Sequence, residues 1–177
     1  MATDAAEVQL IPAEELAPGQ IGAIRNELKK RVLQLACTEC NIEASRMIVR
    51  DIRPDTDMGF SYEDWRETTG ATADAWETMD TGTMADQRWV VIYGLIDDAD
   101  NRSCSSLKFN VGGADRVIWT LQHLNAEFGC VGISPGGVVI PQNAPYTIYR
   151  WVRSVNSTTQ IVLKGFVIEP RGKVISP

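Results

Sequence analysis

The first regular pattern of apolar and polar residues along the chain is helical and begins at Gln20. Apolar residues recur there at spacings of three and four, as on the buried face of an amphipathic helix; they are Ile21, Ile24, Leu28, Val32 and Leu35. Arg25, Lys29 and Lys30 fall on the opposite face. The pattern predicts a helix that ends near Cys37 and packs one face on the rest of the protein.

After this helix, the chain carries short apolar runs that predict β-strands. Residues 88–96 are almost all apolar, which is typical of a central strand covered on both faces. Leu107, Phe109 and Val111 alternate with polar residues, as in a half-buried strand. Shorter runs bounded by turn-forming residues predict further strands at residues 46–52, 131–133, 138–140, 146–153 and 160–169.

The segment that follows Gly112 and Gly113 has two interpretations. Its apolar residues fit one helical face, and Asp115 near the start would suit the helix dipole; these apolar residues are Val117, Ile118, Leu121 and Leu124. A strand through residues 117–121 is the alternative. The whole pattern predicts a mainly β (α+β) fold, an antiparallel β-sandwich or barrel-like domain with an N-terminal helix and one short helix.

The domain organisation follows from the same pattern: a single β-rich domain over residues 20–170, with an arm at each end. Residues 1–19 contain two prolines and show little periodicity, so we expect an extended arm that a partner orders. Residues 171–177 form a second expected arm, with Arg171 and Lys173 as candidate partner contacts. The acidic N-terminus lacks the apolar region of a secretory signal, and no run approaches the roughly 20 apolar residues that span a bilayer.

Charge is distributed unevenly along the chain. Residues 55–86 hold nine acidic residues and one basic residue, Arg66, and therefore carry a net charge of −8 within a chain of net charge −6. The acidic balance argues against non-specific binding of nucleic acid. No period is sustained in this segment, so we expect a long surface loop that solubilises the protein or meets a basic partner.

Aromatic residues make this acidic segment unusual for a loop. Trp65 and Trp76 lie in it, outside any predicted core element. Tryptophan is enriched at the energetic centres of protein interfaces, so both are candidate partner-binding residues. Alternatively, they anchor the loop to its own domain. Tyr146, Tyr149 and Trp151, in contrast, are expected to pack inside the sandwich.

Histidine and cysteine chemistry is restricted in this sequence. The single histidine, His123, is interpreted as a surface or interface residue, and its being alone excludes metal sites with several histidines. Cys37 and Cys40 form a CxxC motif, but the motif ends a predicted helix, whereas redox motifs open one. A zinc site would require Cys104 and Cys130 to converge on this pair. Four reduced structural thiols are the simpler expectation.

The acidic and glycine-rich clusters are interpreted as turns rather than binding sites. The aspartates at 55 and 57 and those at 97–100 could hold calcium through oxygen ligands, yet neither cluster fits an EF-hand loop. The glycine pairs at 112–113 and 136–137 match no phosphate-binding motif. We therefore expect no metal, no cofactor and no catalytic residues.

The second half of the chain resembles the β-rich structural proteins of tailed-virus particles, in particular capsid decoration (cement) proteins. The stretches that carry this resemblance are LKFNVGGADRVIWTLQHL, PQNAPYTIYRWVRS and IVLKGFVIEPRGKVISP. The resemblance covers about half of the chain and lies in its style, a small β domain with flexible ends, rather than in a diagnostic motif. It implies a trimer or dimer that binds a capsid lattice.

The function that we expect is a bacteriophage virion protein that is not an enzyme. It would oligomerise and bind or stabilise a capsid shell after assembly in the host cytoplasm, with itself and the major capsid or another virion protein as partners. A neck, tail or baseplate component is a close variant. A carbohydrate- or ligand-binding β-sandwich, with Trp65 and Trp76 as stacking platforms, belongs to a different class. A glycosidase using paired carboxylates is a third possibility.

Overall fold

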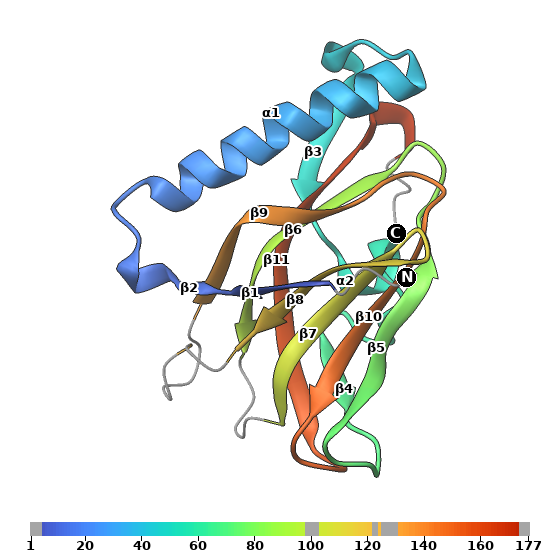
Figure 1. Ribbon diagram of the computed structural model, residues 1–177. Helices are drawn as coiled ribbons and strands as arrows, with labels where there is room; N and C mark the ends of the chain where they lie inside the picture. The colour runs from blue at the N-terminus through green and yellow to red at the C-terminus, as the bar shows by residue number, and fades with distance from the viewer. Residues whose placement is uncertain (1–4, 98–102, 122–123, 125–130, 174–177) are drawn as a thin grey trace.

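Two β-sheets packed face to face form the body of the protein (Figure 1). The computed structural model describes residues 5–97, 103–121, 124 and 131–173. Sheet A has the strand order β1 (Ala6–Gln9), β8 (Ala114–Thr120), β7 (Cys104–Val111), β10 (Pro145–Val152) and β5 (Ala75–Thr83). Sheet B has the order β2 (Ile11–Pro12), β9 (Val131–Ile140), β6 (Trp89–Asp97), β11 (Thr158–Pro170) and β3 (Met47–Asp51). The predicted mainly β fold is confirmed, and it is sandwich-like rather than a closed barrel.

Strand β6 is the centre of the structure because both of its faces are covered. Val90 and Ile92 point into the core between the sheets, whereas Trp89 and Val91 belong to a second core on the other side of sheet B. All of these side chains are at most 1% exposed. This double burial explains the continuous apolar run and confirms the prediction of a central strand.

The second core is closed by helix α1 (Gln20–Cys40), which lies across the outer face of sheet B (Figure 1). Leu28, Val32 and Ala36 are its buried residues, spaced by four, and they contact the sheet. The predicted helix is confirmed, but Leu35 is 50% exposed and is not on the buried face. Each residue of an α-helix is rotated by about 100° from the one before it, so Leu35 points to one side of the helix face that Leu28, Val32 and Ala36 form.

The segment after the glycine pair is a strand, so the helical interpretation of residues 117–124 is wrong there. Gly112 and Gly113 have φ angles of +66° and +78° and form the turn that returns the chain beside β7 as β8. Trp119 then faces the core while Ile118 faces outward. The short helix of the fold lies elsewhere, at α2 (Pro54–Asp57). Single turns of 3-10 helix are present at Ala13–Glu15, Ala44–Arg46 and Arg171–Lys173.

The glycine pair at 136–137 does not end a strand, contrary to the prediction of two strands around it. Residues 131–140 form one strand, β9, in which the register against β6 shifts between Ile92 and Gly94. Gly137 has a φ angle of +59°, and a Cβ there would lie 3.1 Å from the carbonyl oxygen of Ile92. The sequence SPGG therefore forms a bulge inside the strand instead of a turn between strands.

The N-terminal segment closes one side of the sandwich and is not a free arm over residues 6–12. β1 pairs in parallel with β8 at the edge of sheet A, and β2 pairs antiparallel with β9 at the edge of sheet B. Leu10, between the two strands, is 0% exposed. The proline count suggested irregularity, but backbone pairing with two sheet edges overrides it.

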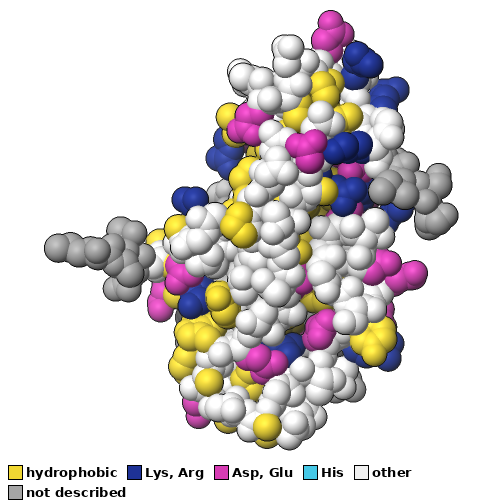
Figure 2. Space-filling view, turned by 90° about the vertical axis from the view of Figure 1, so that its right-hand side faces the viewer, with side chains coloured by type: hydrophobic (Ala, Val, Ile, Leu, Met, Phe, Trp, Pro, Cys, Tyr) yellow, Lys and Arg dark blue, Asp and Glu magenta, His cyan; other side chains and the backbone are white. Residues whose placement is uncertain are grey.

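Residues 55–86 close the opposite side, so the predicted long surface loop is wrong. The segment contains the last three residues of α2, then β4 (Arg66–Thr68), which pairs with β11, and β5, the edge strand of sheet A. Met58, Phe60 and Trp65 insert into the core, where the rings of Phe60 and Trp65 meet at 4.9 Å. Figure 2 looks onto the side where β5 lies and shows acidic, basic and hydrophobic side chains scattered among the white atoms of the backbone and of other side chains.

A candidate binding face on sheet A

The outer face of sheet A lies on the side of the sandwich away from α1 (Figure 1). Strand register aligns its outward side chains in rows that run across all five strands. One row is Thr78, Tyr149, Lys108, Ile118 and Glu7. The next row is Trp76, Trp151, Ser106, Thr120 and Gln9. We call this surface the open face and define it by Trp76, Thr78, Lys108, Ile118, Tyr149 and Trp151.

The centre of the open face is a lysine held between aromatic rings. The Nζ atom of Lys108 lies 4.6 Å from the ring centroid of Tyr149 and 5.0 Å from that of Trp76. The same Nζ lies 3.5 Å from the Oδ2 atom of Asp115. Trp76 in turn meets Trp151 edge-on, with ring centroids 5.3 Å apart. Cation–π and aromatic contacts of this kind fix the side chains in place, each contributing about 0.5–1.5 kcal/mol.

The alternation of β10 explains why these aromatic residues are outside the core. Tyr146, Ile148, Arg150 and Val152 are buried, whereas the residues between them are half-buried. Tyr149 and Trp151 therefore face outward, which corrects the expectation that they pack inside the sandwich. Tyr146 is buried as expected. Period-two alternation was visible in the sequence, but it does not say which of the two sets faces the core.

The four candidate partner-binding residues are not brought together. Trp65 is 7% exposed and packs in the core, so it anchors its segment. Trp76 is half-buried on the open face, where it contacts Trp151 and Lys108. Arg171 is exposed on the C-terminal turn of 3-10 helix. Lys173, on the same turn, donates to the carbonyl oxygen of Asp86 and lies 3.6 Å from its carboxylate.

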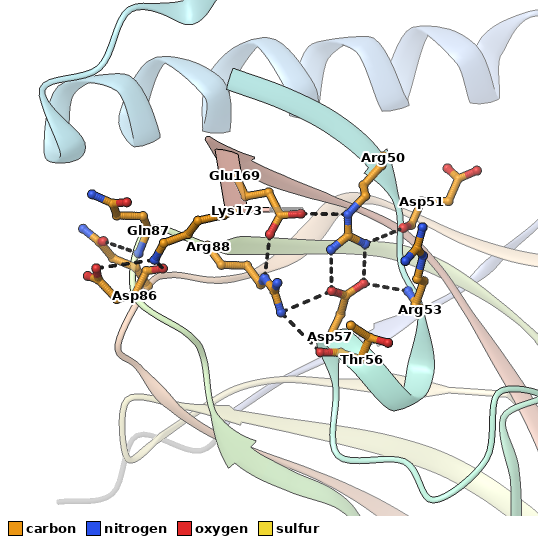
Figure 3. A network of polar contacts seen from close by, with 11 residues as sticks. Arg50, Asp51, Arg53, Thr56, Asp57, Asp86, Gln87, Arg88, Glu169 and Lys173 are labelled. Atoms are coloured by element: carbon orange, nitrogen blue, oxygen red, sulfur yellow. Dashed lines mark hydrogen bonds and ion pairs between the residues drawn. The ribbon is translucent and has the colours of Figure 1, made fainter. Parts of the chain in front are cut away.

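A ring of four charged residues is buried near the end of sheet B (Figure 3). Arg50 binds Asp57 through both Nη atoms at 2.6 Å and Glu169 through Nε at 2.8 Å. Arg88 binds Glu169 through Nε at 2.8 Å and lies 3.3 Å from Asp57. The side chains of Asp57 and Glu169 are 0% exposed. No local sequence pattern indicates this ring, because its members lie in four separate segments.

The acids of the ring already have hydrogen-bond partners, and these partners come from different elements, which the ring therefore holds together. The Asp57 carboxylate also accepts from the backbone N–H of Arg53 at 2.7 Å, and Arg88 donates to the carbonyl oxygen of Thr56 at 3.2 Å. Hydrogen bonding to Asp57 raises the pKa of Arg50 above its ordinary value, against the opposing effect of burial. The ring joins β3, α2 and β11 to the residue that precedes β6. The calcium interpretation of residues 55–57 does not hold for Asp57, whose oxygens are used by arginines.

A further buried arginine, Arg150, crosses the core at the other end of the sandwich. It is 2% exposed and donates to the Glu77 carboxylate at 2.7 Å, to the carbonyl oxygen of Thr68 at 2.7 Å and to the Thr159 hydroxyl at 3.0 Å. Burial acts to raise the pKa of Glu77, but hydrogen bonds from Arg150 and the Gly70 N–H outweigh it, so that pKa is lowered. Arg150 thus links sheet A to β4 and β11.

Asp80 is the buried acid whose environment least favours its charged form. It is 4% exposed, and its Oδ2 atom has no hydrogen-bond partner among the described residues. Burial raises its pKa, although hydrogen bonds from the Gly59 N–H and the Tyr146 hydroxyl act in the opposite direction. The register against β10 shifts beside Asp80, and this bulge turns both Met79 and Asp80 into the core.

The cysteines that the structure describes are free thiols. Cys37 and Cys40 are half-buried at the end of α1, and Cys104 is buried. Burial raises the pKa of Cys104 to about 11 and also raises the pKa of Cys40, where Asp86 and Glu39 add to the effect. Raised values disfavour the thiolate that redox chemistry needs. Cys130 and His123 lie outside the described residues, and so do Asp98 and Asp100 of the second aspartate cluster.

An apolar groove lies between the C-terminal half of α1, β9 and the turn of the β7–β8 hairpin. Its volume is about 460 Å³. Leu35, Val138 and Val139 line it together with Val117, and Arg116 stands on the hairpin side. The exposure of Leu35 is explained by this position beside the groove. The lining can accommodate an apolar side chain, and it brings no paired carboxylates together.

Comparisons of the chain with models of protein families, with curated proteins and with solved structures give no match. None of the described helices is both long and apolar enough to cross a membrane. Among the residues that the structure describes, three or more potential metal ligands do not gather in one place. The open face is the candidate functional site.

Proposed function

We propose that this chain is a structural protein of a virus particle, which oligomerises and binds a capsid shell as a decoration (cement) protein. The observation that best supports the proposal is the open face, where two tryptophans, a tyrosine and a lysine lie side by side on a sheet. Tryptophan and tyrosine are enriched where protein interfaces hold most of their binding energy. Among the described residues, sheet B is covered by α1 on its outer side, whereas the outer side of sheet A has no helix packed on it.

Preorganisation adds to the suitability of the open face for binding. Lys108 is only 18% exposed and already contacts Tyr149, Trp76 and Asp115. Side chains that are fixed before binding lose little conformational entropy on association. The strands beneath them are anchored by a core of buried aromatic and aliphatic side chains. A rigid face of this kind suits repeated docking on a protein lattice.

The remaining parts of the proposal concern the partners. We propose a binding role without catalysis, with a second copy of the chain and the major capsid protein or another virion protein as partners. The net charge of −6 favours a protein partner over nucleic acid. Neck, tail and baseplate positions would use the same face and differ only in the protein that is bound.

The experiment measures binding of the purified chain to shells assembled from the major capsid protein of the virus that encodes it. Cosedimentation should recover the chain with the shells, and Trp151→Ala should weaken binding at least tenfold. Tyr62→Ala is the matched control, because Tyr62 is 58% exposed and lies outside the open face. The proposal is wrong if the unmodified chain does not sediment with shells or with any assembled virion component. It also fails if both variants bind as the unmodified chain does.

A second candidate is a carbohydrate-binding β-sandwich, favoured by the aromatic rings and hydroxyl side chains that share the open face. Sugar rings stack on aromatic side chains, and Thr78, Ser106 and Thr120 could bind sugar hydroxyl groups. Trp65 is excluded from this role by its burial, so Trp76 and Trp151 would be the platforms. Glycan-array binding that Trp151→Ala abolishes, without shell binding, would favour this candidate over the first.

A further inference from the structure

We infer that residues 6–12, with the strands β1 and β2, are exchanged between chains in the oligomer. They would then pair with β8 and β9 of a second copy of this chain. In the structure they form the edge strands β1 and β2, which pair with β8 of sheet A and β9 of sheet B on one side of the sandwich (Figure 1). Ala6–Gln9 pair with Val117–Thr120, and Ile11 and Pro12 pair with Ile133 and Gly132. This inference deepens the proposed assembly role and rests on it for the oligomer.

The acceptor edge is formed by segments remote from the arm in sequence. β8 is held by β7 on its other side, and β9 is held by β6. Both neighbours pair over most of their length without any contribution from residues 6–12. Because exposed sheet edges present unpaired N–H and C=O groups, this side of the sandwich accepts an added strand whichever chain supplies it.

The arm buries Leu10 and Pro12, and its specificity comes from the larger apolar side chain, Leu10. Leu10 is 0% exposed, while Ala6, Glu7 and Gln9 are exposed. Gly132 provides the space for Leu10, because a Cβ at Gly132 would lie 2.9 Å from the Leu10 Cδ1 atom. The space beside Gly132 therefore favours an apolar side chain at the point where the arm crosses from sheet A to sheet B. A second copy of the chain carries that side chain at the same position.

The connection between the arm and α1 can act as a hinge. Ala17, Pro18 and Gly19 are exposed, and a Cβ on Gly19 would meet nothing within 4 Å. Gly19 has a φ angle of +83°, and α1 begins directly after it without a side-chain cap. Residues 13–16, of which Ala13 and Leu16 pack on the second core, would move with the arm. Exchange between copies then preserves these contacts and changes only the hinge, which makes it a low-cost route to an oligomer. High local concentration on a shell would favour exchange by mass action.

Two single-cysteine additions test the exchange in the full chain. Ile11 and Ile133 are register partners, and side chains directly opposite each other on antiparallel strands have Cβ atoms about 5 Å apart. An Ile11→Cys chain and an isotopically labelled Ile133→Cys chain are mixed at assembly concentrations, oxidised and digested. We expect a disulfide-linked peptide that joins the two chains, identified by mass spectrometry and so distinguished from links of the native thiols. Its yield should rise with concentration.

The control replaces Ile11→Cys with Asn26→Cys, an exposed position on α1, and should give a yield at least fivefold lower. An oligomer that forms without the mixed 11–133 link overturns the exchange and leaves the proposed function standing. A chain that stays monomeric and gives no link overturns the exchange too. A monomeric chain also contradicts the oligomerisation in the proposed function, whereas its shell binding is tested separately, in an experiment that does not depend on these substitutions.

Discussion

Arg50 on β3 and Asp57 on α2 form a two-bonded ion pair, with both Nη–Oδ distances at 2.6 Å. The Asp57 side chain is 0% exposed, whereas Asp55, two residues earlier in the same short helix, is exposed. Asp57 therefore stabilises the fold through an ion pair, whereas Asp55 is a surface charge. The pair, extended by Arg88 and Glu169, holds α2 against sheet B.

The first prediction concerns this buried pair. Asp57→Asn should lower the free energy of unfolding by about 3 kcal/mol, because removing one member of a buried ion pair leaves its partners without compensation. Chemical denaturation followed by circular dichroism measures the loss. Asp55→Asn is the matched control in the same helix and should change stability by less than about 0.5 kcal/mol. Equal effects of the two substitutions would contradict the structural role of the ring.

The second prediction tests the arm as a part of the core. Leu10→Ala should destabilise the protein by about 2–5 kcal/mol, since Leu10 is fully buried and the substitution leaves a cavity. Leu35→Ala is the same chemical change at a position that is 50% exposed, and we expect a much smaller loss. Thermal and denaturant unfolding compare the two. A free N-terminal arm would give no loss for Leu10→Ala.

The third prediction concerns close backbone packing in sheet B. A Cβ at Gly165 would lie 2.1 Å from the carbonyl oxygen of Val91, beside the register shift between β11 and β6. Gly165→Ala should therefore cost about 1–3 kcal/mol through overpacking. At Gly136 a Cβ would meet nothing within 4 Å, so Gly136→Ala should be close to neutral. A neutral Gly165→Ala, measured by the same unfolding experiments, would mean that the strands can separate at little cost.

The fourth prediction is a dependence of stability on pH that originates at Asp80. Burial raises its pKa in the folded protein, so between the ordinary carboxyl pKa, about 3.9, and the folded value the native state binds more protons than the unfolded state. The contribution of Asp80 to stability is thus largest below the ordinary pKa and is lost as pH rises through the folded value. Asp80→Asn replaces the titrating carboxyl group with an amide, so the variant does not lose this stability as pH rises.

The measurement compares unfolding free energies of Asp80→Asn and the unmodified chain from pH 3 to pH 7. The variant should gain stability relative to the unmodified chain as pH rises. Glu77 provides a contrast of opposite sign, because its pKa is lowered and its stabilisation is present above the ordinary value and lost at low pH. Glu77→Gln should therefore cost stability at pH 7 and little at low pH. A relative loss for Asp80→Asn with rising pH would mean that the fold stabilises the charged carboxylate.

The sequence by itself determined the elements whose pattern is local. The spacing of apolar residues was enough for α1, and the continuous apolar run was enough for β6 as a strand covered on both faces. The alternation at residues 107–111 likewise predicted β7. These predictions succeed because a helix or a strand has its own period, which burial imposes on the sequence directly.

Tertiary structure alone decided the features that depend on partners far along the chain. The arm became two strands because the edges of β8 and β9 accept it, and the acidic segment became α2, β4 and β5 because its apolar residues close the sandwich. Tyr149 and Trp151 face outward although their alternation allowed either side. The charged ring unites Arg50, Asp57, Arg88 and Glu169 only when four segments meet. No local period encodes such contacts, because the energy that selects them arises between segments rather than within one.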